Sequence, residues 1–244
     1  MATVLGESGR YVTEQSTKKF LMLFLLLYLF GIVVGFLSGY LIGAKQNYLS
    51  LIFVLIAPFM FKLFKGKIKT IESERLSFRK GAVGEALTGY ILNGLPNSYY
   101  VVNDLKAEFG NIDHVVIGPT GVYLLDTKNW AGTITADNNG ELLRNGKPTD
   151  KPEVKNFTRR VMSTKERIRT LCGLDPYFQG IFVFPSAYVD SKSKKVGYVD
   201  CVIGEKLHDY IVGKPNKLSK KDIESISKAF SQLARMDTGF EDKK

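Results

Sequence analysis

The chain has 244 residues, of which 34 are Lys or Arg and 24 are Asp or Glu, so its formal net charge is +10. Its two cysteines, Cys172 and Cys201, form no CxxC pair and have no histidine at ligand spacing, which excludes the common zinc-binding motifs. No P-loop, GxSxG, HExxH or dinucleotide fingerprint occurs either. The basic charge is compatible with nucleic acid or an anionic membrane as partner, and equally with an ordinary solvated surface.

The apolar residues are concentrated near the N-terminus. The run 20–44 contains 25 residues without a charge, which is enough for a helix to cross a bilayer core of about 30 Å. A signal peptide is the competing interpretation, but its apolar region would be shorter. A second run, 48–61, is short for a span, and a re-entrant segment is its alternative. We therefore expect a cytoplasmic tail at 1–19 and a two-helix transmembrane hairpin at 20–64.

Basic residues flank this hairpin on both sides: Arg10, Lys18 and Lys19 before it, and Lys62, Lys65, Lys67, Lys69 and Arg75 at its end and beyond. Basic flanks stay on the cytoplasmic side, so we expect an integral membrane protein with both termini and the soluble domain in the cytoplasm. The first helix carries small residues at a spacing that favours close helix packing: Gly31, Gly35 and Gly39. Their partner is either the second span or another copy of the chain, as in a homo-oligomer within the lipid bilayer.

The soluble part, 79–244, follows a basic segment at 65–78 that is either a linker or a helical lead-in. Its patterning predicts an α/β fold. The predicted elements in chain order are a helix over 77–93, strands over 99–105, 112–118 and 121–128, a hairpin over 132–147, a helix over 152–171, strands over 180–184 and 198–203, and a helix over 220–234.

The two strands around the turn Gly118–Gly121 place charged residues opposite one another. If the hairpin is symmetric about the bond between Pro119 and Thr120, Asp113 faces Asp126, and directly opposed residues point to the same side. The alternation of a strand adds Lys128 to that side. A β-bulge at the turn would shift the register by one residue and separate the three side chains.

Two opposed carboxylates repel each other and need compensation, which a divalent cation such as Mg²⁺ supplies. Such an ion polarises a phosphoryl oxygen and lowers the pKa of a bound water. Lys128 would then orient or deprotonate that water, or stabilise the developing charge. The alternative is a surface salt bridge between Lys128 and one of the aspartates.

Several segments occur together in a characteristic order: Gly81–Glu85, Leu95–Pro96, Val102–Leu105, Asn111–Tyr123 and Asp126–Gly132. In this set and spacing the chain resembles the nuclease-related domain (NERD) family over about 79–190. That family is similar to the PD-(D/E)xK restriction-endonuclease-like nucleases. The resemblance implies a restriction-endonuclease-like mixed sheet flanked by helices, and cleavage of DNA or RNA with Mg²⁺ or Mn²⁺.

Carried over by position, the resemblance implies that Glu85, Asp113 and Asp126 hold the metal and that Lys128 completes the catalytic set. The family more often has glutamate where this chain has Asp126. It also tends to have a glutamine on the helix after the sheet, and Asn156 is the nearest equivalent in this chain. Asn156 is the candidate for positioning the substrate.

Trp130 is a second candidate for the substrate, since an aromatic ring stacks on a base, although it also suits the edge of a core. His114 alternates to the face opposite Asp113 and is expected to pack within the fold. The basic residues of the 152–171 helix, among them Arg160, are either contacts for phosphate or a solvated helix face, and the solvated face is the more usual reason for such charges.

Three hypotheses follow. The first is a membrane-anchored, Mg²⁺-dependent nuclease on the cytoplasmic side. The second is a catalytically inactive, membrane-tethered module that binds nucleic acid or acts as a scaffold. The third is a small membrane protein whose soluble domain mediates assembly.

Overall fold

The computed structural model describes residues 1–43 and 47–238. The chain divides into two compact units. One unit contains Met1–Arg10 together with Gly81–Lys244, and the other is Tyr11–Lys80. One helix, Asn47–Asn93, continues through the boundary between Lys80 and Gly81.

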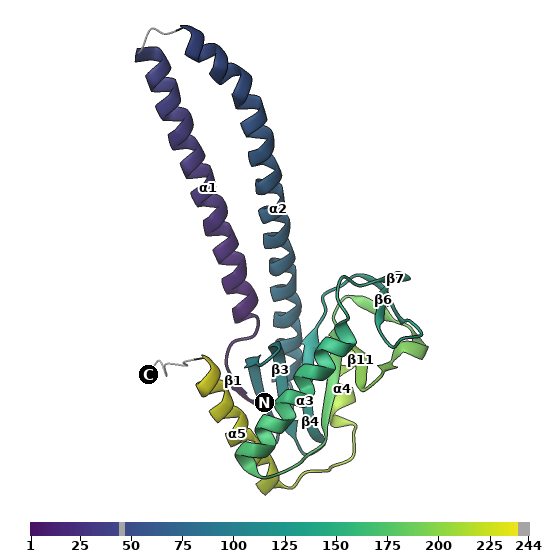
Figure 1. Cartoon of the computed structure of the whole chain (residues 1–244). Coiled ribbons are helices and arrows are strands. Elements are labelled where there is room, and N and C mark those ends of the chain that lie inside the picture. The colour runs from purple at the N-terminus through teal and green to yellow at the C-terminus, as the bar shows by residue number, and fades with distance from the viewer. Residues whose placement is uncertain (44–46, 239–244) are drawn as a thin grey trace. The chain divides into compact units, whose positions relative to one another are not determined.

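The Tyr11–Lys80 unit consists of helical segments. Helix α1 spans Arg10–Gly43 and helix α2 spans Asn47–Asn93 (Figure 1). Within the part of the chain that is described, one segment, Arg10–Val33, is long and apolar enough to cross a membrane. The predicted second span is helical from Asn47 onward, but the surroundings of most of its side chains lie outside the described residues. A membrane hairpin therefore stays a prediction.

The segment 65–78, expected as a linker or a helical lead-in, is helical, because α2 continues through it without a break. The predicted helix over 77–93 is the last part of the same element. Its sequence contains no proline after Pro58 before Pro96. Since proline is the residue that most strongly ends a helix, nothing in this stretch stops the helix early.

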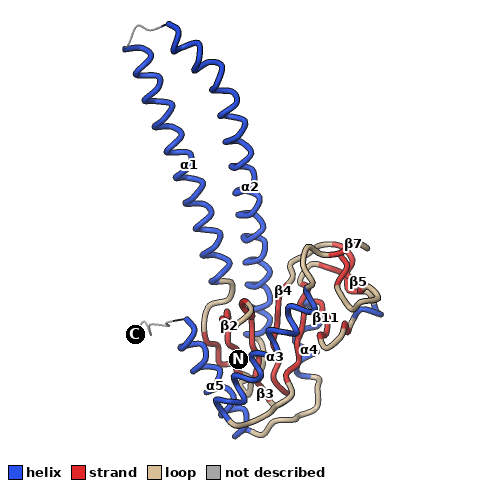
Figure 2. Tube along the Cα trace, viewed as in Figure 1, coloured by secondary structure: helices blue, strands red, loops and turns tan. Residues whose placement is uncertain are grey.

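The other unit is built on a seven-stranded mixed sheet, which confirms the predicted α/β class (Figure 2). The strand order is β1-β2-β3-β4-β8-β11-β10. Strands β2, β3 and β4 form an antiparallel meander, and β8 and β11 then add parallel to β4. The bounds are β1 Thr3–Leu5, β2 Tyr100–Ala107, β3 Gly110–Gly118, β4 Gly121–Thr127, β8 Phe178–Phe184, β10 Lys195–Val196 and β11 Val199–Ile203.

Helices cover both faces of this sheet (Figure 1). Helices α3 (Glu153–Cys172) and α5 (Lys220–Thr238) pack on one face, in the core that contains Leu124, Phe157 and Phe230. The end of α2 and helix α4 (Gly204–Val212) cover the other face. The sequence analysis did not predict α4 as an element. Alternation along each strand sends neighbouring side chains to opposite cores, so Leu124 lies in the first core and Leu125 in the second.

A second sheet of four short strands has the order β7-β6-β5-β9. It contains the predicted 132–147 hairpin and adds one strand that was not predicted. The bounds are β5 Gly132–Ala136, β6 Leu142–Arg144, β7 Lys147–Pro148 and β9 Ala187–Val189, after which a 3-10 helix, η1, spans Ser191–Ser193.

Strand β1 was not expected in a stretch interpreted as a tail. It pairs parallel with β2, with Thr3 opposite Tyr100 and Leu5 opposite Val102. Asn103 reinforces this edge, since its side-chain amide donates to the Gly6 carbonyl oxygen at 3.2 Å. Thr3–Leu5 are therefore an edge strand of the seven-stranded sheet, and Met1–Arg10 belongs to the same compact unit as Gly81–Lys244.

Candidate active site

The register of the β3–β4 hairpin is the one that the sequence predicted. Pairing runs from Gly118 opposite Gly121 to His114 opposite Leu125 without a bulge. The next opposed pair in this register is Asp113 and Asp126. The backbone N–H of Thr127 donates to Asp113 Oδ2 at 2.6 Å, which ties the two strands together at this point. The hairpin thus brings two carboxylates to its open end.

Asp126 is buried and has a cation on each carboxylate oxygen. Lys128 Nζ lies 2.8 Å from Oδ1, and Arg160 Nη2 lies 2.5 Å from Oδ2. Burial would raise the pKa of Asp126, but the two neighbouring cations outweigh it and hold that pKa below its usual value. Asp126 is therefore ionised and fully paired.

Lys128 directly follows β4 and is held between two carboxylates. Besides Asp126, it contacts Glu153 Oε2 at 3.0 Å, at the first turn of α3. Burial would lower the pKa of Lys128, but both carboxylates act against it and the net shift is upward. Lys128 is consequently a fixed positive charge, which suits stabilisation of negative charge better than removal of a proton.

Glu85 reaches the same region from α2 and is buried, with only 6% of its surface exposed. Burial, followed by repulsion from Asp113, raises the pKa of Glu85 to about 9. Burial and the charge of Asp126 likewise raise the pKa of Asp113 to about 7. Among the described residues, neither Glu85 nor Asp113 forms a direct ion pair like those of Asp126, and their raised pKa values mark a place where a further positive charge would be stabilised.

The local sequence explains how α2 comes so close to β4. A Cβ at Gly84 would lie 2.5 Å from Asn129 Cβ, so only glycine allows this approach. Thr127 donates its hydroxyl to Thr88 of α2 at 3.2 Å, one turn further along the helix. Ser8 of the N-terminal segment donates its hydroxyl to the Glu85 carbonyl oxygen at 2.7 Å. The position of Glu85 thus depends both on the N-terminal segment Met1–Arg10 and on the end of β4.

Asp104 belongs to the same acidic group and was missed as a site residue. It lies between Asn103, which pairs with His114, and Leu105, which pairs with Ile112, so it stands beside Asp113 on the next strand. Its φ of +54° is unusual for a residue other than glycine. Its charge contributes to the raised pKa of Glu85, and Asn111 Nδ2 donates to its Oδ1 at 2.9 Å. The pairing of opposed residues that placed Asp113 opposite Asp126, applied to the β2–β3 hairpin, would have placed Asp104 opposite Asp113.

Arg160 was also misjudged. The sequence analysis interpreted it as part of a solvated helix face, but its side chain is mostly buried and contacts Asp126 and the Asn111 carbonyl oxygen. Its guanidinium lies over the Phe157 ring, with 5.2 Å to the centroid. The apolar residues Val154, Phe157 and Val161 set the inward face of α3, and Arg160 lies at its border. A helix period alone does not separate such a border position from the solvent face.

The two candidate substrate residues lie at the margin of this cluster. Asn156 is exposed on α3, one turn before Arg160. Trp130 is partly buried against Phe184, with ring centroids 6.0 Å apart, and Lys128 Nζ lies 5.9 Å from its ring centre. His114 is fully buried on the opposite face and is paired with Asn103 at 2.8 Å. Burial lowers the pKa of His114 to about 4, as suits a packed, neutral residue.

The donor set fits a divalent cation in part. Carboxylate oxygens are the ligands that Mg²⁺ and Mn²⁺ prefer, and Glu85 and Asp113 bear raised pKa values that a cation would relieve. Within residues 1–43 and 47–238, however, no three His, Cys, Asp or Glu side chains are placed to hold a metal ion together. Asp126 would join Glu85 and Asp113 as a ligand only after Lys128 or Arg160 moved from its oxygens.

Comparison with known proteins agrees with the resemblance. The family model described as nuclease-related domain (NERD) matches residues 80–185. An uncharacterized protein of Bacillus anthracis is 44% identical over 61 residues, which cover 22% of this chain and 29% of that protein. The chain thus spans under a third of the length of this relative. No solved structure matches the chain. The matched residues include Glu85, Asp113, Asp126 and Lys128.

Proposed function

We propose that this chain, whose residues 80–185 match the nuclease-related domain family, is a membrane-anchored, metal-dependent nuclease that hydrolyses phosphodiester bonds of DNA or RNA on the cytoplasmic side. One observation carries the proposal. The β3–β4 register brings Asp113 and Asp126 together at one hairpin end, where Lys128 and the buried Glu85 join them. A salt bridge on the surface would need neither the burial nor the third carboxyl.

The proposal gives each residue a separate task. Glu85 and Asp113 would hold Mg²⁺ or Mn²⁺, with Asp126 as a further ligand. When bound, such an ion polarises a phosphoryl oxygen and lowers the pKa of a coordinated water. Lys128, held charged by Asp126 and Glu153, would stabilise the negative charge that develops on the phosphate. Arg160 would release one oxygen of Asp126 and contact a neighbouring phosphate.

Substrate contacts would come from the margin of the cluster. Asn156 and Arg160 lie one turn apart on α3, so their side chains project to the same side of the helix. Trp130 offers part of an aromatic ring next to Lys128, where it would stack on a base. These residues would place the scissile phosphate beside the carboxyls.

The fold supports the expected topology in a way that charge alone does not. Residues before α1 form β1, and residues after position 80 form the strand that β1 pairs with. If Tyr11–Lys80 enters a membrane, both of its ends must therefore return to the same side. With the basic flanks, this supports a hairpin anchor at 20–64 with the sheet in the cytoplasm. The small residues Gly31, Gly35 and Gly39 would allow close packing of the anchor in a homo-oligomer.

The test uses the full chain in a mild detergent, since a fragment beginning after the apolar helices would lack β1. Labelled DNA and RNA strands are incubated with Mg²⁺ or Mn²⁺, and with chelator. Cleavage should require the metal and fall about a thousandfold or more in Asp113→Asn and Lys128→Met, as expected for loss of groups that act on the transition state.

The surface ion pair of Lys165 and Asp175, 2.9 Å apart, offers matched controls. Lys165→Met and Asp175→Asn make the same chemical changes away from the cluster and should leave cleavage unchanged. Cleavage that survives both Asp113→Asn and Lys128→Met would refute the assignment.

One observation favours a second candidate, a module that binds nucleic acid without cleaving it. Both oxygens of Asp126 are occupied by cations of the chain itself, so the carboxyl is already compensated. This candidate predicts salt-dependent binding of nucleic acid by the full chain, with no cleavage under any divalent metal. Cleavage with Mg²⁺ or Mn²⁺ that Asp113→Asn removes would exclude it.

A further inference from the structure

A small cavity lies at the end of the β3–β4 hairpin opposite the carboxyls. It has a volume of about 70 Å³. Since a single water needs only about 10–15 Å³ of such space, the cavity has room for an ion of several atoms. Its lining contains two cations and no acidic residue: Thr120, Gly121, Val122, Tyr123, Tyr177, Gln179, Tyr210, Lys214 and Lys217.

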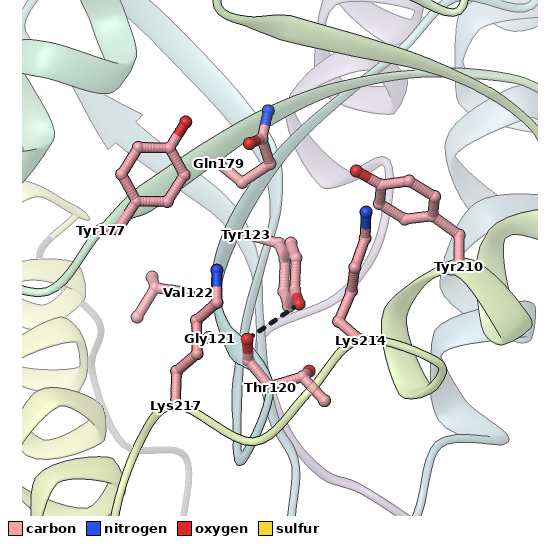
Figure 3. A pocket seen from close by; sticks show the side chains of 9 residues that line it. All are labelled: Thr120, Gly121, Val122, Tyr123, Tyr177, Gln179, Tyr210, Lys214 and Lys217. Atoms are coloured by element: carbon pink, nitrogen blue, oxygen red, sulfur yellow. Dashed lines mark hydrogen bonds between the residues drawn. The ribbon is translucent and has the colours of Figure 1, made fainter.

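The two lysines are held in place over tyrosine rings. Lys214 Nζ lies 4.3 Å from the Tyr210 ring centre, and Lys217 Nζ lies 5.6 Å from that of Tyr177. Their amino groups lie between these two rings (Figure 3). The backbone N–H of Lys217 donates to the Pro119 carbonyl oxygen at 2.7 Å, which fixes the segment to the hairpin turn. The site is therefore positioned by the fold and not only by long flexible side chains.

The lysine charges are not compensated. In the described part of the chain, neither Lys214 nor Lys217 forms an ion pair with a carboxylate. The Tyr210 hydroxyl is already committed, because it donates to Asp200, and the Tyr123 hydroxyl donates to the Thr120 carbonyl oxygen at 3.1 Å. The Gln179 amide donates to the Gly180 and Tyr198 carbonyl oxygens, and the Thr120 hydroxyl is paired with that of Tyr99. The lining therefore offers a ligand two ammonium groups and the hydroxyl of the exposed Tyr177. Such a set fits an anion with several oxygens, such as a phosphate group.

A larger groove of about 750 Å³ continues from this cavity and shares Tyr210 and Lys214 with it. It adds further basic residues to the lining, namely Lys194, Lys195 and Lys206, against Asp200 and Asp209. Its lining also includes Tyr188, two residues after Ser186, whose hydroxyl bonds the side chain of Asn129 at 3.0 Å beside Lys128. The groove thus extends from the turn end of the hairpin toward its open end.

We infer that the Lys214–Lys217 cavity binds a phosphate group, and that this phosphate belongs to a nucleic-acid strand lying in the groove. Val122 of the cavity and Lys128 are six residues apart on β4, or roughly 20 Å along a strand. That separation requires several nucleotides, and exposed tyrosines beside lysines are the surface on which single strands stack. Binding of a phosphate group at this cavity does not depend on the proposed function, whereas binding of a nucleic-acid strand there rests on it.

The test measures binding by the full chain in detergent with chelator present, so that no cleavage occurs. The probes are inorganic phosphate, thymidine monophosphate and a thymidine decanucleotide. The variant Lys214→Gln/Lys217→Gln should weaken binding of each probe about tenfold or more, and Lys214→Arg/Lys217→Arg should retain it. For the strand, the slope of log K against log salt should decrease by about 0.7 for each lost contact.

A matched control removes the same charge elsewhere: Lys221→Gln/Lys228→Gln changes two exposed lysines of α5 and should alter binding less than twofold. Tighter binding of the decanucleotide than of phosphate identifies a strand as the source, and equal binding identifies free phosphate at the same site. Binding of all three probes that is unchanged in Lys214→Gln/Lys217→Gln overturns the inference.

This result is independent of catalysis. Phosphate binding that depends on Lys214 and Lys217, together with absence of metal-dependent cleavage, would retain the site and reject the nuclease proposal. Cleavage that requires Asp113 and Lys128, with phosphate binding indifferent to Lys214 and Lys217, would do the reverse.

Discussion

The two ends of the β3–β4 hairpin use charge in opposite ways. At the open end, Asp126 is buried and each of its oxygens contacts a cation. At the turn end, Lys214 and Lys217 are exposed, and the described contacts of their side chains are with tyrosine rings. A buried charge must be compensated within the fold, whereas an exposed one remains available to a ligand. The open end therefore affects stability and function together, and the turn end affects binding alone.

The largest effect is expected from breaking the charge cluster at the open end. Asp126→Asn removes the carboxylate that both Lys128 and Arg160 contact, and leaves two mostly buried cations short of a partner. The free energy of unfolding should fall by about 3–5 kcal/mol, as for removal of one partner from a buried ion pair. Urea denaturation of the full chain, followed by circular dichroism, measures this loss.

The surface pair provides the control for this change. Asp175→Asn removes the exposed partner of the partly buried Lys165 and should cost about 1 kcal/mol or less. If the two variants lose equal stability, burial does not distinguish the cluster from an ordinary surface pair.

The next effect is a dependence of stability on pH. Because the pKa of Glu85 is raised to about 9, the folded protein keeps a proton that the unfolded chain has released above about pH 4.5. Stability should therefore be greatest below this value and decrease as pH rises toward 9, with a contribution of the same sign from Asp113 as pH rises from about 4 to 7. Thermal unfolding of metal-free protein from pH 5 to 9 measures the change.

Glu85→Gln separates this contribution from the other titrating groups. The variant should lose less stability over the same pH range, and the difference should shrink when Mn²⁺ is added to the wild-type protein, because the cation stabilises the ionised carboxyls. Parallel pH profiles for the variant and the wild type would mean that Glu85 is not the responsible group.

A smaller effect is expected at Arg160, which competes with a metal for Asp126. Arg160→Gln should strengthen binding of Mn²⁺ about tenfold, the equivalent of about 1.4 kcal/mol, because one oxygen of Asp126 becomes available. Isothermal titration calorimetry measures the affinity, and Arg169→Gln, in an exposed pair with Glu166, is the control. Weaker binding of Mn²⁺ by the Arg160 variant would show that Arg160 supports the metal site.

The sequence predicted the register of the β3–β4 hairpin correctly, because the relevant geometry is local. A tight turn sets the register of a hairpin, so the opposition of Asp113 and Asp126 followed from position alone. Arg160 was misjudged because its role depends on how α3 packs on the sheet. Strand β1 was missed because only three residues form it and its partner lies almost a hundred positions away. The local sequence pattern does not indicate a pairing over such a separation.

The smallest effect is expected at the turn end, where loss of a lysine should leave stability almost unchanged. Lys217 is exposed, and its contact with the Tyr177 ring is worth about 0.5–1 kcal/mol at most at such a site. Lys217→Gln also keeps the backbone bond to Pro119, since that bond uses the main-chain N–H. Urea denaturation should give a free energy of unfolding within about 0.5 kcal/mol of the wild type. A loss above about 1 kcal/mol would instead mean that the lysine supports the fold, and the contrast between the two hairpin ends would not hold.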